Sequence, residues 1–165
     1  MANEIISRKV LIVEDRDINC DSAVAGAIGR LTDALEKRYI EVDFAPTYVE
    51  AAPIAWNDMD IDAFLVFTDM DLDRKTELNA IKLLHKIKER QAGVPVFLLA
   101  DRAQTSEAMS RRLMELGSEF VWIFEDSAEF IAGRVDAAIY RFREQLLPPL
   151  MKAIWEYNEH NHEYS

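Results

Sequence analysis

The sequence predicts an α/β fold in which five parallel strands form one sheet with helices on both faces, followed by a helical extension at the C-terminus. The central observation is the run Ala63–Phe67 (AFLVF), five apolar residues that end in an acidic, turn-like segment. Such a short run, rich in β-branched and aromatic residues, is typical of a strand buried on both faces of a parallel sheet. Helical patterns on either side supply the crossovers, and strand and helix patterns alternate five times along the chain.

Each predicted strand is a short apolar run bounded by charged or turn-forming residues. The second run alternates apolar and polar residues, which is typical of a strand at or near the edge of a sheet. Five parallel strands joined by helical crossovers predict the doubly wound order 2-1-3-4-5 of flavodoxin-like and receiver-like folds. The expected strands are Lys9–Val13, Ile40–Ala45, Ala63–Phe67, Val94–Leu99 and Phe120–Phe124.

The helices are predicted from apolar residues that recur every three or four positions. The first has its apolar stripe within Val24–Leu35, and Asp21 or Ser22 can cap it. The second, Tyr48–Asn57, contains Pro53, so we expect it to be weak or to start late. The remaining helices are expected over Glu77–Gln91, from about Thr105 to Leu116, and from Ser127 onward.

The last predicted helix differs from the others in length. After its cap at Ser127, one apolar stripe continues over residues 131–146. By Arg141 the helix has run about 20 Å, enough to leave the body of a small domain. We therefore divide the chain into a body, residues 1–130, and a helical linker, residues 131–165.

Beyond that stripe the linker is expected to meet a partner. Pro148 and Pro149 kink or break the helix. The helical pattern that follows has apolar residues on more than one side, and a peripheral helix of this kind needs a partner. Trp155 lies in this segment, whereas Trp56 and Trp122 are expected to serve as packing residues. The predicted interface residues are Leu146, Leu147, Pro148, Pro149, Leu150, Met151, Ile154, Trp155 and Tyr157.

Length, charge and cysteine content narrow the possible functions. At 165 residues, one domain with a short extension is expected. Thirty acidic residues against nineteen basic ones give a formal net charge of −11, which disfavours nucleic-acid binding because the phosphate backbone is also negative. Cys20 is the single cysteine, so no internal disulfide can form, and neither a signal peptide nor a membrane span is recognisable. A cytoplasmic protein is the expectation.

A phosphoacceptor centre of the receiver type is the first candidate site. It requires an acidic pair after the first strand, a carboxylate after the third, a hydroxyl after the fourth and a lysine after the fifth. Glu14 and Asp15 supply the acidic pair and are weak candidates for binding Mg²⁺, which prefers oxygen ligands. The other three positions fall on Phe67, Ala100 and Phe124. Three of the four parts are therefore missing.

The remaining candidate sites are weaker. Thr68 or Asp69 could replace the missing acceptor only with a shifted register. The acidic run that begins at Asp69 resembles a calcium loop, but Arg74 stands where Gly is required and Ala80 where a bidentate Glu is required. No constellation in the sequence supports nucleophilic or acid–base catalysis, and no residue is assigned to a catalytic or cofactor-binding role.

Several segments carry a resemblance to one enzyme family. They resemble inducible bacterial Orn/Lys/Arg decarboxylases, with the arginine-specific members nearest, over nearly the whole chain. The LLPPL element with its following aromatic-rich segment is the most specific part, and the match is poor between Asn57 and Glu77. The segments are Val10–Asp15 (VLIVED), Arg30–Leu35 (RLTDAL), Val94–Arg102 (VPVFLLADR), Glu119–Arg134 (EFVWIFEDSAEFIAGR), Arg143–Leu150 (REQLLPPL) and His162–Ser165 (HEYS).

The resemblance implies that this region is an N-terminal wing domain, a receiver-like fold without phosphotransfer residues, followed by a helical linker. It implies a parent enzyme that uses pyridoxal 5′-phosphate (PLP) to decarboxylate a basic amino acid, consuming a proton in acid stress. It also implies that wing and linker support dimers that assemble into a decamer, so the partners are the PLP-binding domain and sister subunits. The Schiff-base lysine and the phosphate-binding loop would lie after Ser165, so no catalytic residue is carried over.

Two interpretations follow from different classes of function. The first is a non-catalytic assembly domain, for which the charge adds a hypothesis: carboxylate repulsion opposes subunit association near about pH 7 and weakens toward about pH 5. The second is a stand-alone pseudo-receiver that docks a protein partner in signalling or as a scaffold, and it predicts metal binding at Glu14 and Asp15. An enzyme complete within these residues has almost nothing in its favour.

Overall fold

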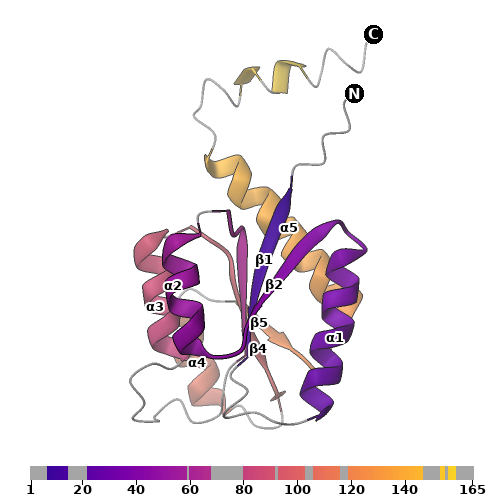
Figure 1. The fold of residues 1–165 in the computed structure, drawn as a ribbon, viewed down its shortest axis with the longest axis vertical. Helices are drawn as coiled ribbons and strands as arrows, with labels where there is room; N and C mark the ends of the chain where they lie inside the picture. Colours follow the sequence, from indigo (N-terminus) through magenta and orange to yellow (C-terminus); the bar gives the residue numbers. More distant parts are fainter. Residues whose placement is uncertain are drawn as a thin grey trace.

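A computed structural model confirms the predicted sheet. All five strands are parallel and lie in the order β2-β1-β3-β4-β5 (Figure 1). The strands are β1 (Arg8–Val13), β2 (Ile40–Ala45), β3 (Ala63–Phe67), β4 (Val96–Ala100) and β5 (Glu119–Trp122). The structure describes residues 7–14, 22–58, 60–67, 80–91, 93–102, 106–115, 119–146, 153–154 and 156–158.

The central strands are buried as the apolar runs predict. Every residue of β3 and of β4 is buried, and Val66 pairs with Val13 on one side and with Leu98 on the other. Among the described strands β2 pairs with β1 alone, which confirms its predicted place at the edge, and its four inner residues are exposed or half-buried. The central strands of the sheet are thus fully buried, and the edge strand β2 is partly exposed.

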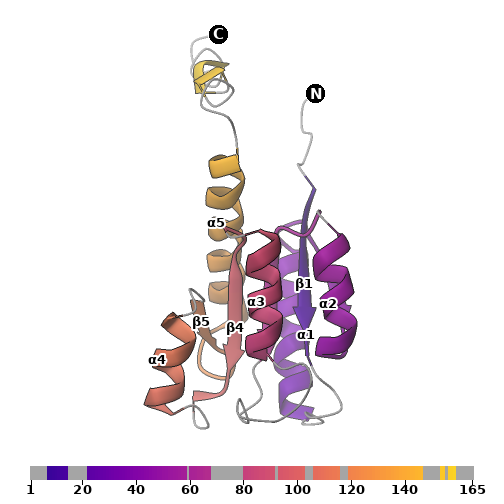
Figure 2. The ribbon, with the colours of Figure 1, turned by 90° about the vertical axis from the view of Figure 1, so that its left-hand side faces the viewer.

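Helices cover both faces of the sheet (Figure 1 and Figure 2). α1 and α5 lie on one face, whereas α2 and α3 lie side by side on the other. The helices are α1 (Ser22–Glu36), α2 (Tyr48–Asn57), α3 (Ala80–Arg90), α4 (Glu107–Glu115) and α5 (Ala128–Leu146).

Two apolar clusters hold these layers together. On the α1 and α5 face, the predicted apolar stripe of the first helix is buried, and its residues are Val24, Ile28, Leu31 and Leu35. On the other face, Leu84 and Ile87 of α3 are buried as predicted. The apolar spacing of this helix also includes Leu78, which lies outside the described residues.

The predicted bounds of α2, Tyr48–Asn57, are confirmed, and the late start that Pro53 suggested does not occur. The helix begins at Tyr48, ahead of Pro53, because Thr47 caps it: its side-chain oxygen accepts the Glu50 N–H at 3.0 Å. Proline removes a single N–H donor from a helix that is otherwise anchored, since Tyr48 and Ala51 are buried against the sheet. Tertiary packing therefore outweighs the local cost of proline.

The largest boundary differences lie at the start of β4 and the end of β5, and the other strand ends agree with the prediction to within one residue. β4 begins at Val96 rather than at Val94, and Pro95, which has no N–H, contributes only its carbonyl to the Phe64 N–H at 3.0 Å. β5 ends at Trp122 rather than at Phe124, because the Trp122 carbonyl accepts the backbone N–H groups of the turn that follows.

α5 stays on the body longer than expected. Ser127 caps it as predicted, accepting the Phe130 N–H at 3.1 Å. The helix has not left the body by Arg141, because Phe142 is still buried in the cluster shared with α2 and α3. The boundary after residue 130 remains a prediction, and this packing favours a linker that starts after Arg143.

Candidate functional site

The carboxyl edge of the sheet is where a receiver-type centre would lie. Glu14 follows β1 directly and is buried, with its backbone N–H donating to the Ala45 carbonyl at 3.2 Å. The structure therefore places Glu14 at the expected edge. Asp15, Thr68 and Asp69 lie outside the described residues.

The structure places apolar residues at the strand ends where a receiver domain would have its other three phosphotransfer residues. Phe67 ends β3 and Ala100 ends β4, and both are buried, while Phe124 is 43% exposed just after β5. The Tyr48 hydroxyl donates to the Phe67 carbonyl at 2.7 Å, a contact that sequence reasoning missed. Phe67 and Tyr48 thus pack together at the strand end where a receiver domain would have its phosphoacceptor.

Metal ligands do not gather in the described part of the chain. Among those residues, no group of three or more His, Cys, Asp or Glu side chains could hold an ion. His85 is exposed on α3. Cys20, His160 and His162 lie outside the described residues.

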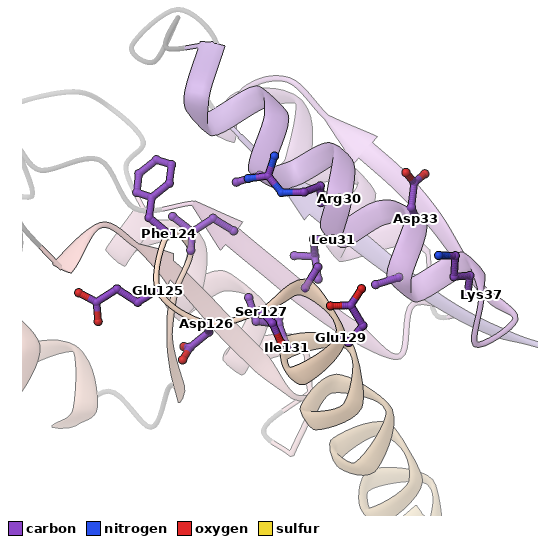
Figure 3. Close-up of a pocket in the computed structure, with 14 residues that line it drawn as sticks. Arg30, Leu31, Asp33, Lys37, Phe124, Glu125, Asp126, Ser127, Glu129 and Ile131 are labelled. Atoms are coloured by element: carbon purple, nitrogen blue, oxygen red, sulfur yellow. The ribbon is translucent and has the colours of Figure 1, made fainter.

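A pocket of about 450 Å³ opens between α1 and the turn that leads into α5 (Figure 3). Four carboxylates and two cationic side chains line it, so the charge of the lining opposes a phosphate group. The charged residues are Arg30, Asp33, Lys37, Glu125, Asp126 and Glu129. PLP, which the family resemblance implies for the parent enzyme, does not fit this pocket.

The amino edge of the sheet carries the best-defined polar cluster. Asp62, just before β3, is 7% exposed, and its carboxylate accepts Nε of Arg143 at 2.8 Å and Nη2 of the same residue at 2.6 Å. The Lys9 backbone N–H donates to the same carboxylate at 3.0 Å. Because Arg143 belongs to the last turn of α5, this bidentate pair ties the end of that helix to the centre of the sheet.

A second carboxylate, which belongs to Asp136 of α5, extends this polar cluster. Asp136 accepts from Arg8 of β1 and from Nη1 of Arg38 at 3.1 Å. Burial, with the neighbouring charges of Arg143 and Arg38, lowers the pKa of the Arg8 guanidinium. Sequence reasoning missed these ion pairs, because the partners lie up to 128 positions apart. One available signal was the position of Asp62 directly before the most apolar strand.

A third ion-pair group links α2 to the first two strands. Nζ of Lys9 lies 3.0 Å from carboxylate oxygens of both Asp43 and Asp58. The hydrogen bond to Asp58 is the main cause of the raised pKa of Lys9, and it lowers the pKa of Asp58 in return. The second cause of the lowered Asp58 pKa is a hydrogen bond from the Asp60 N–H.

The predicted interface segment is described only in part. Ile154 and Tyr157 are helical and are 52% and 66% exposed. Leu146 ends α5, but its side chain is not among those described. The role of these three residues stays a prediction, and the remaining predicted interface residues lie outside the described part: Leu147, Pro148, Pro149, Leu150, Met151 and Trp155.

The sheet order and the strand ends define a class: a receiver-like domain in which three of the four phosphotransfer positions are apolar. A receiver domain protein (CheY-like) from Methanospirillum hungatei JF-1 has the same fold, with a TM-score of 0.64 and 16% identity over 84% of this chain and 98% of that one. No described helix is both long and apolar enough to cross a membrane.

Sequence comparison gives the family. The profile of the Orn/Lys/Arg decarboxylase N-terminal domain matches residues 23–142, and the chain belongs to this family. It is 43% identical to the biodegradative arginine decarboxylase of Escherichia coli (strain K12) over 95% of this chain and 20% of that protein. The structure of lysine decarboxylase A from Pseudomonas aeruginosa matches with a TM-score of 0.74 and 22% identity over 94% of this chain and 21% of that one. The chain thus spans about a fifth of these relatives.

Proposed function

We propose that this chain is the non-catalytic N-terminal assembly domain of a cytoplasmic, PLP-dependent decarboxylase of a basic amino acid, with arginine the favoured substrate, and that it serves acid resistance. One observation carries the proposal: 43% identity to an arginine decarboxylase of which the chain spans only 20%. The remaining four-fifths of such a protein would hold the PLP-binding lysine and phosphate loop. PLP supplies the electron sink for decarboxylation when bound there.

The course of α5 supports a role in assembly. Its C-terminal end projects past the amino ends of the strands (Figure 1), and the pair formed by Arg143 and Asp62 fixes its direction at that edge. A linker that starts after Arg143 would carry the predicted interface residues, from Leu146 to Tyr157, toward the PLP-binding domain and sister subunits. Dimers joined in this way would assemble further, up to a decamer.

Charge would make that assembly sensitive to pH. The net charge of −11 per copy repels sister subunits near neutral pH, and protonation of carboxylates relieves this repulsion. Sedimentation velocity of the full-length enzyme between about pH 7.5 and about pH 5 tests the idea. We expect larger species at the acidic end, and a size that does not change with pH would contradict it.

A deletion separates assembly from catalysis. Full-length enzyme lacking residues 1–157, and with them the predicted interface residues, is expected to lose its largest assemblies while its PLP absorbance is retained. Loss of PLP binding in a protein that remains folded by circular dichroism would show that the domain contributes directly to the cofactor site.

The pseudo-receiver interpretation is the second candidate, because the fold covers 98% of a solved receiver domain. It predicts that Mg²⁺ shifts the amide resonances around Glu14 and Asp15, and that Glu14→Gln abolishes the shift. A titration without such shifts, up to about 10 mM Mg²⁺, would remove its main support.

A further inference from the structure

Residues of α2 and α3 line a groove. The two helices lie side by side on the face of the sheet opposite α1 and α5 (Figure 2). The volume of the groove is about 710 Å³. One wall, from α2, is mainly apolar, and the other, from α3, carries charged and polar side chains. The lining residues are Ala52, Pro53, Ala55, Trp56, Asn57, Lys82, His85, Lys86 and Glu89.

The apolar wall is centred on a tryptophan. Trp56, which we expected from the sequence to pack inside, is 56% exposed instead. Val49, seven residues earlier on the same helix, is 68% exposed, and Ala52 and Pro53 lie between them, so α2 has an outer apolar stripe besides its buried one. Tryptophan is among the residues that contribute most to protein–protein binding when a partner covers them.

The opposite wall, from α3, carries lysine side chains and is positively charged, whereas the chain as a whole is negatively charged. Lys82, His85 and Lys86 are exposed at spacings of three and four residues on one side of α3, and among the described residues that line the groove Glu89 is the single acidic one. At physiological salt, charges more than about 8 Å apart are largely screened, so the exposed Lys86 acts on a segment bound in the groove more strongly than the distant acidic residues behind the net charge of −11.

We propose that the groove binds an acidic amphipathic helix of a protein partner. Helices of 10 and 11 residues form its walls, which gives a length of about 15 Å and room for roughly three turns of a docked helix. The apolar stripe of such a helix would cover Trp56, while a row of carboxylates along its flank would face Lys86. The described residues that line this site belong to α2 and α3 and not to α5, so the proposal does not depend on the assembly role proposed above.

A designed peptide provides the probe. It is a labelled 14-residue helix with Leu at positions spaced i, i+3, i+4 and i+7 and Glu on the flank, and its control has Lys in place of each Glu. Fluorescence anisotropy with the 165-residue chain is expected to show binding of the Glu peptide, weakened by added salt, and at least about tenfold weaker binding of the Lys peptide. Equal binding of the two peptides, or no binding of either, would overturn the proposal.

Matched variants locate the binding. Trp56→Ser and Lys86→Glu are each expected to weaken binding of the Glu peptide at least about fivefold, whereas Tyr140→Ser, an equally exposed aromatic residue on α5, should leave it unchanged. Circular dichroism checks that each variant is folded. Unchanged affinity of the Glu peptide for folded Trp56→Ser would overturn the proposal. The proposal would also be overturned if the wild-type chain forms a dimer and Trp56→Ser makes it monomeric, because a second copy of the chain would then occupy the groove.

Discussion

At the scale of single residues, Asp62 is, with Glu14, one of the buried charged residues in the described part of the chain. Its side chain is 10% exposed, and its carboxylate receives two hydrogen bonds from the guanidinium of Arg143. We expect Asp62→Asn to lower the free energy of unfolding by about 1–3 kcal/mol, because a partly buried guanidinium would lose its charge partner. Urea denaturation measures the change.

The control for Asp62→Asn is an exposed ion pair of similar geometry. Arg102 and Glu125 lie 2.8 Å apart, but their side chains are 62% and 50% exposed. Glu125→Gln is therefore expected to change the free energy of unfolding by less than about 0.5 kcal/mol. Equal effects of the two substitutions would contradict the role given to Asp62.

Tyr39 is the second residue with a specific prediction, because its backbone has a φ of 62° in the turn between α1 and β2. A left-handed conformation strains a residue with a Cβ atom, and Tyr39 is 72% exposed, so little packing would be lost on its removal. We expect Tyr39→Gly to raise the free energy of unfolding by about 0.5–1 kcal/mol. Tyr140→Gly, within the helix α5, should lower it by about 1 kcal/mol, so thermal melts of the two variants should shift in opposite directions.

At the scale of elements, Asp58 connects the end of α2 to β1 through Lys9. The pKa of Asp58 is lowered in the folded state, so its stabilising effect is present above its unfolded pKa of about 4 and is lost as the pH falls through the folded value. We expect the urea midpoint of the wild type to exceed that of Asp58→Asn most above about pH 5, with the difference closing below about pH 3.

Lys9→Met provides the matching background for this pH dependence. The raised pKa of Lys9 means that its own contribution is lost only in strongly alkaline solution, so it stays charged throughout the acid range. In the Lys9→Met background, the difference in urea midpoint caused by Asp58→Asn should be smaller at every pH. A difference that does not vary with pH in either background would contradict the assigned ion pair.

The elements also show what the sequence can and cannot predict. β3 and β4 were predicted because a strand buried on both faces requires an uninterrupted apolar run, which is a local pattern. The bounds of α2 follow the apolar pattern, but the late start expected from Pro53 does not occur, because packing against the sheet outweighs the local effect of proline. The pair of Asp62 and Arg143 was missed for a related reason: its partners are 81 positions apart, and only the completed sheet brings them together.

At the scale of the whole molecule, the same limit applies to the point where body and linker divide. Sequence periodicity follows α5 correctly from Ile131 onward, but it cannot show which part of the helix the sheet covers. In the structure, Ile131, Val135 and Ile139 belong to the apolar cluster on the α1 and α5 face of the sheet. Phe142 belongs to the apolar cluster on the α2 and α3 face. The family profile also ends at residue 142. We therefore infer that the body includes α5 as far as Arg143.

Two truncations test this boundary. A chain that ends at Leu146 keeps the core residues of α5 and the ion pair of Arg143, so we expect a folded domain whose free energy of unfolding lies within about 1 kcal/mol of the full chain. A chain that ends at residue 130 removes at least four buried apolar side chains, each contributing about 1.5–3 kcal/mol, and this loss is comparable to the whole stability of a small domain. We expect it to be unfolded by circular dichroism and by amide dispersion in NMR spectra. A cooperative fold in residues 1–130 alone would place the boundary where the sequence first indicated, and α5 would then belong to the linker.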